Sequence, residues 1–250
     1  MIRGARRAYP GRILRTYETA NRRAMDPWAS FALSTDGLRA RYCELNHLGA
    51  LLRQPSNTVS NLAYAFAGGL LWRTEAAAGR RLVVAACALC LLGLAVGSAL
   101  FHASISLFAQ QLDMAGAYAV LLAGSAAPLL LSRPASRDAW GLGLLFALIA
   151  LFYGFDLYLQ GSWLLPLLVL VAGVSATWAR RRAPAAYQGP WLWRAVCAVA
   201  LAGVAWVLDD RKLGCMPNSW LQWHALWHLA TAFAAHQLFT FHLRGARGAR

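Results

Sequence analysis

Acidic residues are scarce in this chain of 250 residues, which has 10 Asp and Glu against 24 Lys and Arg, and its only lysine is Lys212. Charged residues reach only 14%, whereas about 25% is usual, so a disordered chain or a coiled coil is excluded. Five cysteines are too few for a disulfide scaffold, and 21 glycines are too few for collagen. Hydrophobic residues instead make up 59% and the mean hydropathy is +0.44, which indicates a chain whose solvent is mostly lipid.

The net charge of +14 would by itself suit a nucleic-acid binder. Such a protein gathers its basic residues on one solvated face. Here the Arg residues lie in the first 53 residues and in short breaks between apolar runs, as they do beside membrane helices. The sequence therefore predicts no nucleic-acid partner.

Seven apolar runs follow a polar, Arg-rich N-terminal segment of residues 1–55. They cover residues 57–72, 82–104, 108–131, 139–157, 162–179, 190–208 and 219–242. Most approach the ~20 residues that cross a bilayer as a helix, and only a helix satisfies the backbone of such a run in lipid. We therefore predict an all-α, polytopic membrane protein. Residues 56–243 form a seven-transmembrane helix bundle, and residues 244–250 form a cytoplasmic tail.

The loops between the runs predict the orientation. The breaks after the first, third and fifth runs are rich in Arg, and those after the second and fourth have none. This places the C-terminus in the cytoplasm and the N-terminus outside, although the N-terminal segment has Arg residues of its own. No apolar core precedes Pro10, so that segment is not a signal peptide. The Arg- and Ala-rich composition suggests a bacterial protein, hence one of the inner membrane.

The five cysteines divide by depth. Cys87, Cys90 and Cys197 lie inside apolar runs, where a thiol behaves as a small hydrophobic group. Cys43 and Cys215 lie in polar segments that the topology places outside, where oxidation is permitted. The residues alone leave open whether these two form a disulfide or remain free thiols.

Ionisable groups within the runs are few, and a charge at the centre of a membrane helix costs about 2.5–3.5 kcal/mol or more. His102 ends the second run, Asp113 lies near the start of the third, and His224 and His228 open the seventh. Since four residues advance a helix by about 400°, His224 and His228 share one face, and Ser98 has the same spacing to His102. The topology places all five at similar depth near the outer side.

Three imidazoles at one depth can bind a tetrahedral zinc ion and leave its fourth position to water. Asp113 would hold that water or a ligand histidine. Two alternatives remain: haem, which prefers one His on each of two helices, and histidines that only pack through hydrogen bonds. His236 lies too far along its helix to share the site. Asp209 and Asp210 end the sixth run on the outer side, where two roles are open to them: support of the site, or the plain interfacial position that the sequence favours.

Together these positions resemble the CREST superfamily of seven-helix membrane hydrolases and receptors. The stretch Cys43-Glu44-Leu45-Asn46, the run 57–62 and the segment 206–215 are similar to its alkaline ceramidase branch. The resemblance covers roughly residues 41–242.

The resemblance implies hydrolysis of the amide of ceramide or a similar membrane lipid, by zinc-activated water, to a sphingoid base and a fatty acid. The implied zinc ligands are His102, His224 and His228. Asp113 would be the acid/base partner of the water, and Ser98 would assist the metal site or the developing oxyanion. The family also pairs an N-terminal Cys with one before the last helix, which matches Cys43 and Cys215.

Eukaryotic members of that branch hold a regulatory calcium ion with acidic residues before the first helix. Glu44 and Asn46 match that pattern, but Arg41, Leu45 and Gln54 stand where acids are expected. Calcium takes six to eight oxygen ligands, several of them charged. We therefore expect Glu44 and Asn46 to be a vestigial calcium site, and calcium not to regulate this chain.

Two other functions remain compatible with the sequence. One is a lipid hydrolase that cleaves an ester or an amide other than that of ceramide, because zinc chemistry does not choose between them. The other is a receptor whose zinc only ties helices together, since a structural zinc site is closed whereas a catalytic one keeps an open position.

Overall fold

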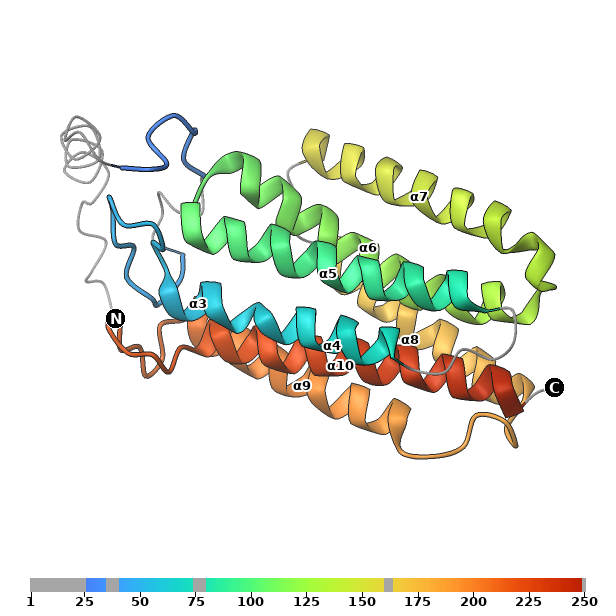
Figure 1. The fold of residues 1–250 in the computed structure, drawn as a ribbon. Coiled ribbons are helices and arrows are strands. Elements are labelled where there is room, and N and C mark those ends of the chain that lie inside the picture. Colours follow the sequence, from blue (N-terminus) through green and yellow to red (C-terminus); the bar gives the residue numbers. More distant parts are fainter. Residues whose placement is uncertain (1–25, 35–40, 74–79, 160–163, 249–250) are drawn as a thin grey trace.

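The computed structural model describes residues 26–34, 41–73, 80–159 and 164–248, and within them it is helical, without a named strand. Its elements are α3 (Pro55–Ser60), α4 (Leu62–Trp72), α5 (Arg81–Ser104), α6 (Leu107–Ser132), a short 3-10 turn (Ala135–Arg137), α7 (Asp138–Leu159), α8 (Leu164–Arg182), α9 (Trp191–Asp210) and α10 (Trp223–Gly248). The long helices run side by side along one axis (Figure 1). Much of the predicted N-terminal segment 1–55 lies outside the described residues.

Within the described residues, most of each apolar run predicted from the sequence is helical. The first run is divided at Asn61 into α3 and α4, and Pro55 occupies the first turn of α3, where its missing N–H has no helical partner to lose. The helix of the last run begins only at Trp223, and it continues to Gly248, into the segment predicted as a tail.

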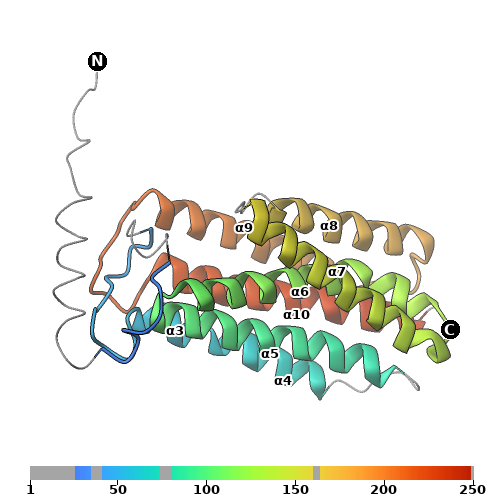
Figure 2. The ribbon, with the colours of Figure 1, turned by 90° about the horizontal axis from the view of Figure 1, so that it is seen from above.

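Four helices of the described chain, α5, α6, α8 and α9, are long and apolar enough to cross a membrane. α7 is apolar over the shorter range Asp138–Gly154. α10 has 26 residues but carries His and Gln on buried positions. The position of α10 in the bundle explains how it can carry these polar residues. Figure 2 shows α6 and α10 in the middle of the bundle, between α3, α4 and α5 on one side and α8 and α9 on the other. A central helix can carry polar groups that lipid would exclude.

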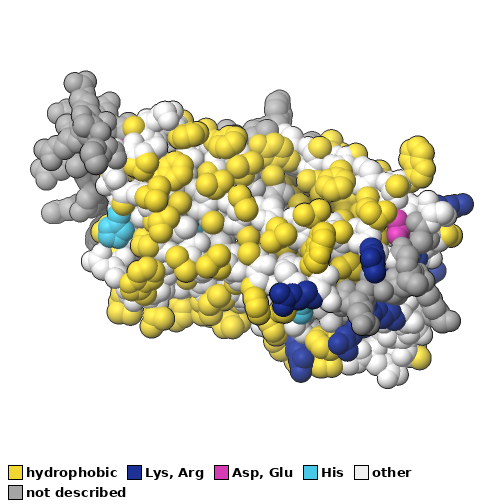
Figure 3. Space-filling model, viewed as in Figure 1, with side chains coloured by type: hydrophobic (Ala, Val, Ile, Leu, Met, Phe, Trp, Pro, Cys, Tyr) yellow, Lys and Arg dark blue, Asp and Glu magenta, His cyan; other side chains and the backbone are white. Residues whose placement is uncertain are grey.

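Large apolar side chains cover the outside of the bundle (Figure 3). Leu89 and Val96 of α5, Leu170 of α8 and Val204 of α9 are all more than half exposed. A water-soluble monomer rarely exposes so continuous an apolar surface. This surface and the four apolar helices together identify a membrane protein.

Helices α5 and α6 pack closely because glycine removes the side chain at two contact points. A Cβ added to Gly97 would lie 2.7 Å from the carbonyl oxygen of Leu112, and one added to Gly116 would lie 2.7 Å from the Cα of Leu94. Small residues allow this backbone approach in membrane helices. The sharp reversal between the helices passes through Ile105, which is buried and has a φ of 50°.

The two ends of the bundle differ in charge. At one end, many of the Arg residues that the structure describes lie at the ends of helices, and they are shown in dark blue in Figure 3. There Arg80, expected from the sequence to be a flanking charge in a loop, is instead buried. Its guanidinium donates to Asp138 at 2.7 Å, and both side chains are at most 3% exposed. Nη1 and Nη2 of Arg80 also donate to the carbonyl groups of Leu130 and Leu131 at the end of α6.

Candidate metal centre

The three predicted histidines converge at the other end of the bundle. His102 comes from α5, and His224 and His228 come from the first turns of α10. The ring centroids lie 4.9 Å apart for His102 and His224, 5.0 Å for His102 and His228, and 4.6 Å for His224 and His228. Each offers one ligating atom within 4.8 Å of the others, and all three side chains are buried. The cluster can hold a metal ion.

Hydrogen bonds on the far nitrogens orient two of the rings. Nδ1 of His102 lies 2.7 Å from Oε1 of Gln54, an acceptor, so this Nδ1 carries the proton. Nδ1 of His228 lies 2.7 Å from Oγ of Ser60, whose own proton is donated to the carbonyl of Asn57. Ser60 therefore accepts from His228, and both rings keep Nε2 for a ligand. Metal-binding histidines are oriented in this way by partners behind them.

Nε2 of His102 is buried and has no hydrogen-bond partner. A buried polar atom without a partner costs about 1–3 kcal/mol. Here that atom belongs to a group of three imidazole side chains, which is the ligand set that zinc takes in some catalytic sites with an open fourth position. The residues present therefore fit a zinc ion.

Asp209 stands behind the third histidine. Nδ1 of His224 lies 3.9 Å from Oδ2 of Asp209, while Oδ1 of Asp209 accepts the backbone N–H of Cys43 at 3.1 Å. Of the two roles open to Asp209, the structure favours support of the site over the plain interfacial position, because the side chain is buried at the end of α9 and directed toward His224. Asp210 is exposed beside Arg211, as an interfacial residue is.

Ser98 and Asp113 lie on α5 and α6 beside the close approach of these two helices at Gly97. Ser98 is buried one turn before His102. A Cβ on the preceding Gly97 would lie 3.1 Å from the backbone nitrogen of Asp113, so the close packing of the two helices brings Asp113 beside this part of α5. His236, in contrast, lies two to three turns beyond His228 on α10, outside the cluster.

Tyr42 and Tyr64 belong to the surroundings of the cluster but were not predicted. The Tyr42 ring lies 4.5 Å from that of His224 and 5.1 Å from that of His102. Tyr64 bonds to Thr231 through its hydroxyl at 2.5 Å, with its ring 6.1 Å from that of His228. The sequence feature that could have predicted Tyr42 near the histidines is its position beside Cys43, since a disulfide fixes the neighbouring backbone.

Cys43 and Cys215 form a disulfide, with their Cα atoms 5.6 Å apart. It joins the segment before α3 to the segment before α10, and the N–H of Leu45 donates to the carbonyl of Pro217 beside it. The three free cysteines of the described chain are Cys87, Cys90 and Cys197.

Replacing both Cys43 and Cys215 by Ser is expected to lower the melting temperature of the purified chain. The disulfide joins residues 172 positions apart, and loss of a native disulfide typically costs about 2–5 kcal/mol. Thermal unfolding in detergent, with and without a reductant, measures the effect. Cys197→Ser, which removes an exposed free thiol, is the control and should leave the melting temperature unchanged. An equal response of both variants would contradict a stabilising disulfide.

The predicted vestigial calcium site is closed by hydrogen bonds. Both carboxylate oxygens of Glu44 accept backbone N–H groups, from Ser56 at 2.6 Å and from Asn57 at 2.8 Å. Burial raises the pKa of Glu44 above its usual value, and these two N–H groups oppose that shift. Oδ1 of Asn46 accepts from Nε2 of Gln54 at 2.6 Å. Backbone N–H groups on Glu44 and an amide NH₂ group on Asn46 thus occupy the oxygens that a cation would need, so these residues do not fit calcium.

Gln54 therefore links the N-terminal segment to the histidines, and Gln54→Leu is expected to weaken zinc binding about 10–100-fold. The substitution removes the acceptor that orients His102. Competition with a chelator of known affinity measures the change. The matched control is Gln237→Leu, because Gln237 is an equally buried glutamine on α10 outside the cluster. Unchanged zinc affinity in Gln54→Leu would show that the hydrogen bond does not support the site.

Comparison with known proteins agrees with this geometry. A search of curated proteins gives no significant match. The family model described as Ceramidase matches residues 39–244, a range that contains the disulfide, the three histidines, Ser98 and Asp113. Since the match spans most of the sequence, the chain belongs to the ceramidase family.

Proposed function

We propose that this chain is a membrane-embedded, zinc-dependent amidohydrolase that cleaves ceramide or a closely related lipid to a sphingoid base and a fatty acid. The observation that carries the proposal is the buried group of His102, His224 and His228, with ligating atoms within 4.8 Å of one another. Membership of the ceramidase family supplies the class of substrate and the bond that is cleaved.

Zinc fits this cluster better than haem does. Two of the three histidines belong to the same helix, four residues apart, whereas haem takes its ligands from opposite sides of the iron. A zinc ion held by the three imidazoles would make a water molecule acidic enough to react near neutral pH and would polarise the amide carbonyl.

The residues of the chain then move the protons and hold the substrate. Asp113 accepts a proton from the attacking water as its oxygen bonds to the amide carbon. It returns that proton to the nitrogen as the C–N bond breaks, so that the sphingoid base leaves as an amine. Ser98 donates a hydrogen bond to the carbonyl oxygen, where negative charge develops, a contribution of about 2.7–4 kcal/mol in other enzymes.

In the proposed membrane arrangement, residues 56–243 form seven spans with the N-terminus outside and the C-terminus in the cytoplasm of a bacterial inner membrane. The Arg-rich end of the bundle (Figure 3) favours this orientation, because basic residues gather on the cytoplasmic side. The histidines then lie in the outer half of the membrane. A lipid amphiphile reaches that depth from the side, with its head group toward water.

The test is a metal assay coupled to identification of lipid products. The purified chain with one zinc ion per molecule is expected to release a fatty acid and a sphingoid base from ceramide, and to lose this activity with a strong chelator. Zinc should restore the activity. Release of fatty acid from ester lipids but not from ceramide would support the alternative function, a lipid hydrolase that cleaves esters. A chelator that lowers only the melting temperature, in a chain that cleaves no lipid, would indicate a receptor with a structural zinc.

A further inference from the structure

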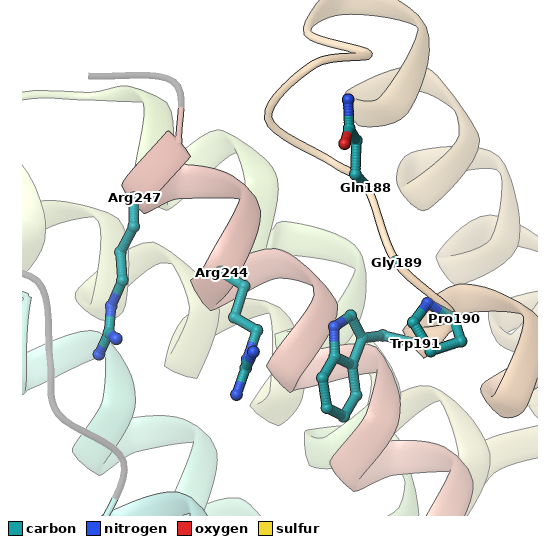
Figure 4. Close-up of a pocket in the computed structure, with 6 residues that line it drawn as sticks. All are labelled: Gln188, Gly189, Pro190, Trp191, Arg244 and Arg247. Carbon is teal, nitrogen blue, oxygen red and sulfur yellow. The ribbon is translucent and has the colours of Figure 1, made fainter.

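A second site lies at the opposite end of the bundle from the histidines. Arg244 is 20 residues beyond His224 on α10, which corresponds to about 30 Å along the helix, the thickness of a bilayer core. Here an open pocket of about 700 Å³ is formed between the end of α10 and the segment that leads into α9. Its lining residues are Gln188, Gly189, Pro190, Trp191, Arg244 and Arg247 (Figure 4).

The pocket is basic and has no acidic residue in its lining. Arg244 and Arg247 extend from α10 in the same direction, and the Arg244 guanidinium lies 4.5 Å from the centre of the Trp191 ring (Figure 4). Arg194 contacts the same ring at 5.3 Å. Within the described chain, the ion pair at this end is that of Arg80 with Asp138. In the part of the chain that the structure describes, no carboxylate pairs with the two lining arginines, so their N–H groups face the pocket as donors for a ligand.

The surroundings place this pocket at the boundary between lipid and water. Trp193 is 69% exposed, and exposed Trp side chains are typical of the interface of a membrane protein. α9 begins at Trp191, so its N-terminus adds a partial positive charge at the pocket. A volume of about 700 Å³ exceeds what a phosphate ion needs and suits a ligand of the size of a lipid head group.

We propose that this pocket binds the phosphate of an anionic phospholipid head group, at the membrane surface opposite the histidines. The planar guanidinium groups of Arg244 and Arg247 donate to the phosphate oxygens. Trp191 holds Arg244 in place and contacts the glycerol part of the lipid. The inference depends on the chain crossing the membrane and is independent of its hydrolytic activity.

Native mass spectrometry of the detergent-purified full chain tests the proposal, with dioleoyl phosphatidylglycerol and dioleoyl phosphatidylcholine as probes. One phosphatidylglycerol is expected to stay bound, in preference to phosphatidylcholine. The double variant Arg244→Gln/Arg247→Gln should weaken this binding tenfold or more, because each Arg near an anionic lipid contributes about one power of ten or somewhat less. Trp191→Leu, which keeps the charges, should weaken it by a smaller factor.

The matched control is Arg133→Gln/Arg137→Gln, which removes two exposed charges from the same end of the bundle, beside α6 and α7. It should change phosphatidylglycerol binding less than twofold. An equal loss of phosphatidylglycerol binding in the two double variants would mean that the lipid is held by the general surface charge of this end, and it would overturn the proposal. Displacement of the lipid by inorganic phosphate at equal concentration would overturn the lipid assignment in favour of a free-anion site. Unchanged zinc content in every variant shows that the fold is intact.

Discussion

His228→Ala is expected to abolish both zinc binding and lipid hydrolysis. The variant leaves two imidazoles of the three, and a catalytic zinc site needs three protein ligands. It also removes the N–H group of His228 whose hydrogen bond Ser60 accepts in the intact site. Zinc content per chain, measured by elemental mass spectrometry beside ceramide turnover, should fall to background together with activity. His224→Ala is expected to behave in the same way.

The matched control is His236→Ala, a histidine of the same helix that is half-buried and lies outside the cluster. It should retain zinc and turnover. Both variants should keep the helical circular dichroism of the parent chain, which separates loss of the metal from loss of the fold. Full zinc occupancy in His228→Ala would remove the three-histidine site and, with it, the proposed mechanism.

Asp113→Asn is expected to keep zinc and to lose turnover by about 10²–10⁴-fold, the range for removal of a general acid/base group. The amide has nearly the shape of the carboxylate, so the packing of α6 against α5 at Gly97 should persist. It cannot, however, accept the proton of the attacking water. Zinc content, kcat and KM for ceramide separate the two effects, and the loss should appear in kcat.

Asp210→Asn provides the control for that experiment. Asp210 is an exposed carboxylate at the same end of the bundle, 3.9 Å from Arg211, and its replacement should leave kcat within twofold. If Asp113→Asn retains full turnover, Asp113 is a packing residue. If it loses zinc as well, Asp113 supports the metal rather than the proton transfer.

The helices and the end of the bundle at which the histidines meet could be predicted from the sequence because both depend on local rules. A run of about 20 apolar residues has to be helical in lipid, and a fixed rise per residue converts sequence position into depth. His102 and His224 therefore had to lie near the same end once alternate runs were taken as antiparallel. Helical spacing put His228 on the same face as His224.

The extents of the helices were predicted less accurately from the sequence, for two physical reasons. Asn61 divides the first run into α3 and α4, and the apolar pattern of the run did not predict this break. α10 carries buried His and Gln residues, so hydropathy alone would understate a helix that lies in the middle of the bundle.

Only the tertiary structure decided which groups stand behind the histidines. Gln54, Ser60 and Asp209 come from a loop, a short helix and a helix end, and no periodicity relates them to His102, His228 and His224. The packing also turned Arg80 inward to Asp138 and formed the open pocket between Trp191 and Arg244. Sequence spacing fixes height along a helix, whereas the direction in which a side chain points, and the partner it meets, depend on how neighbouring helices pack.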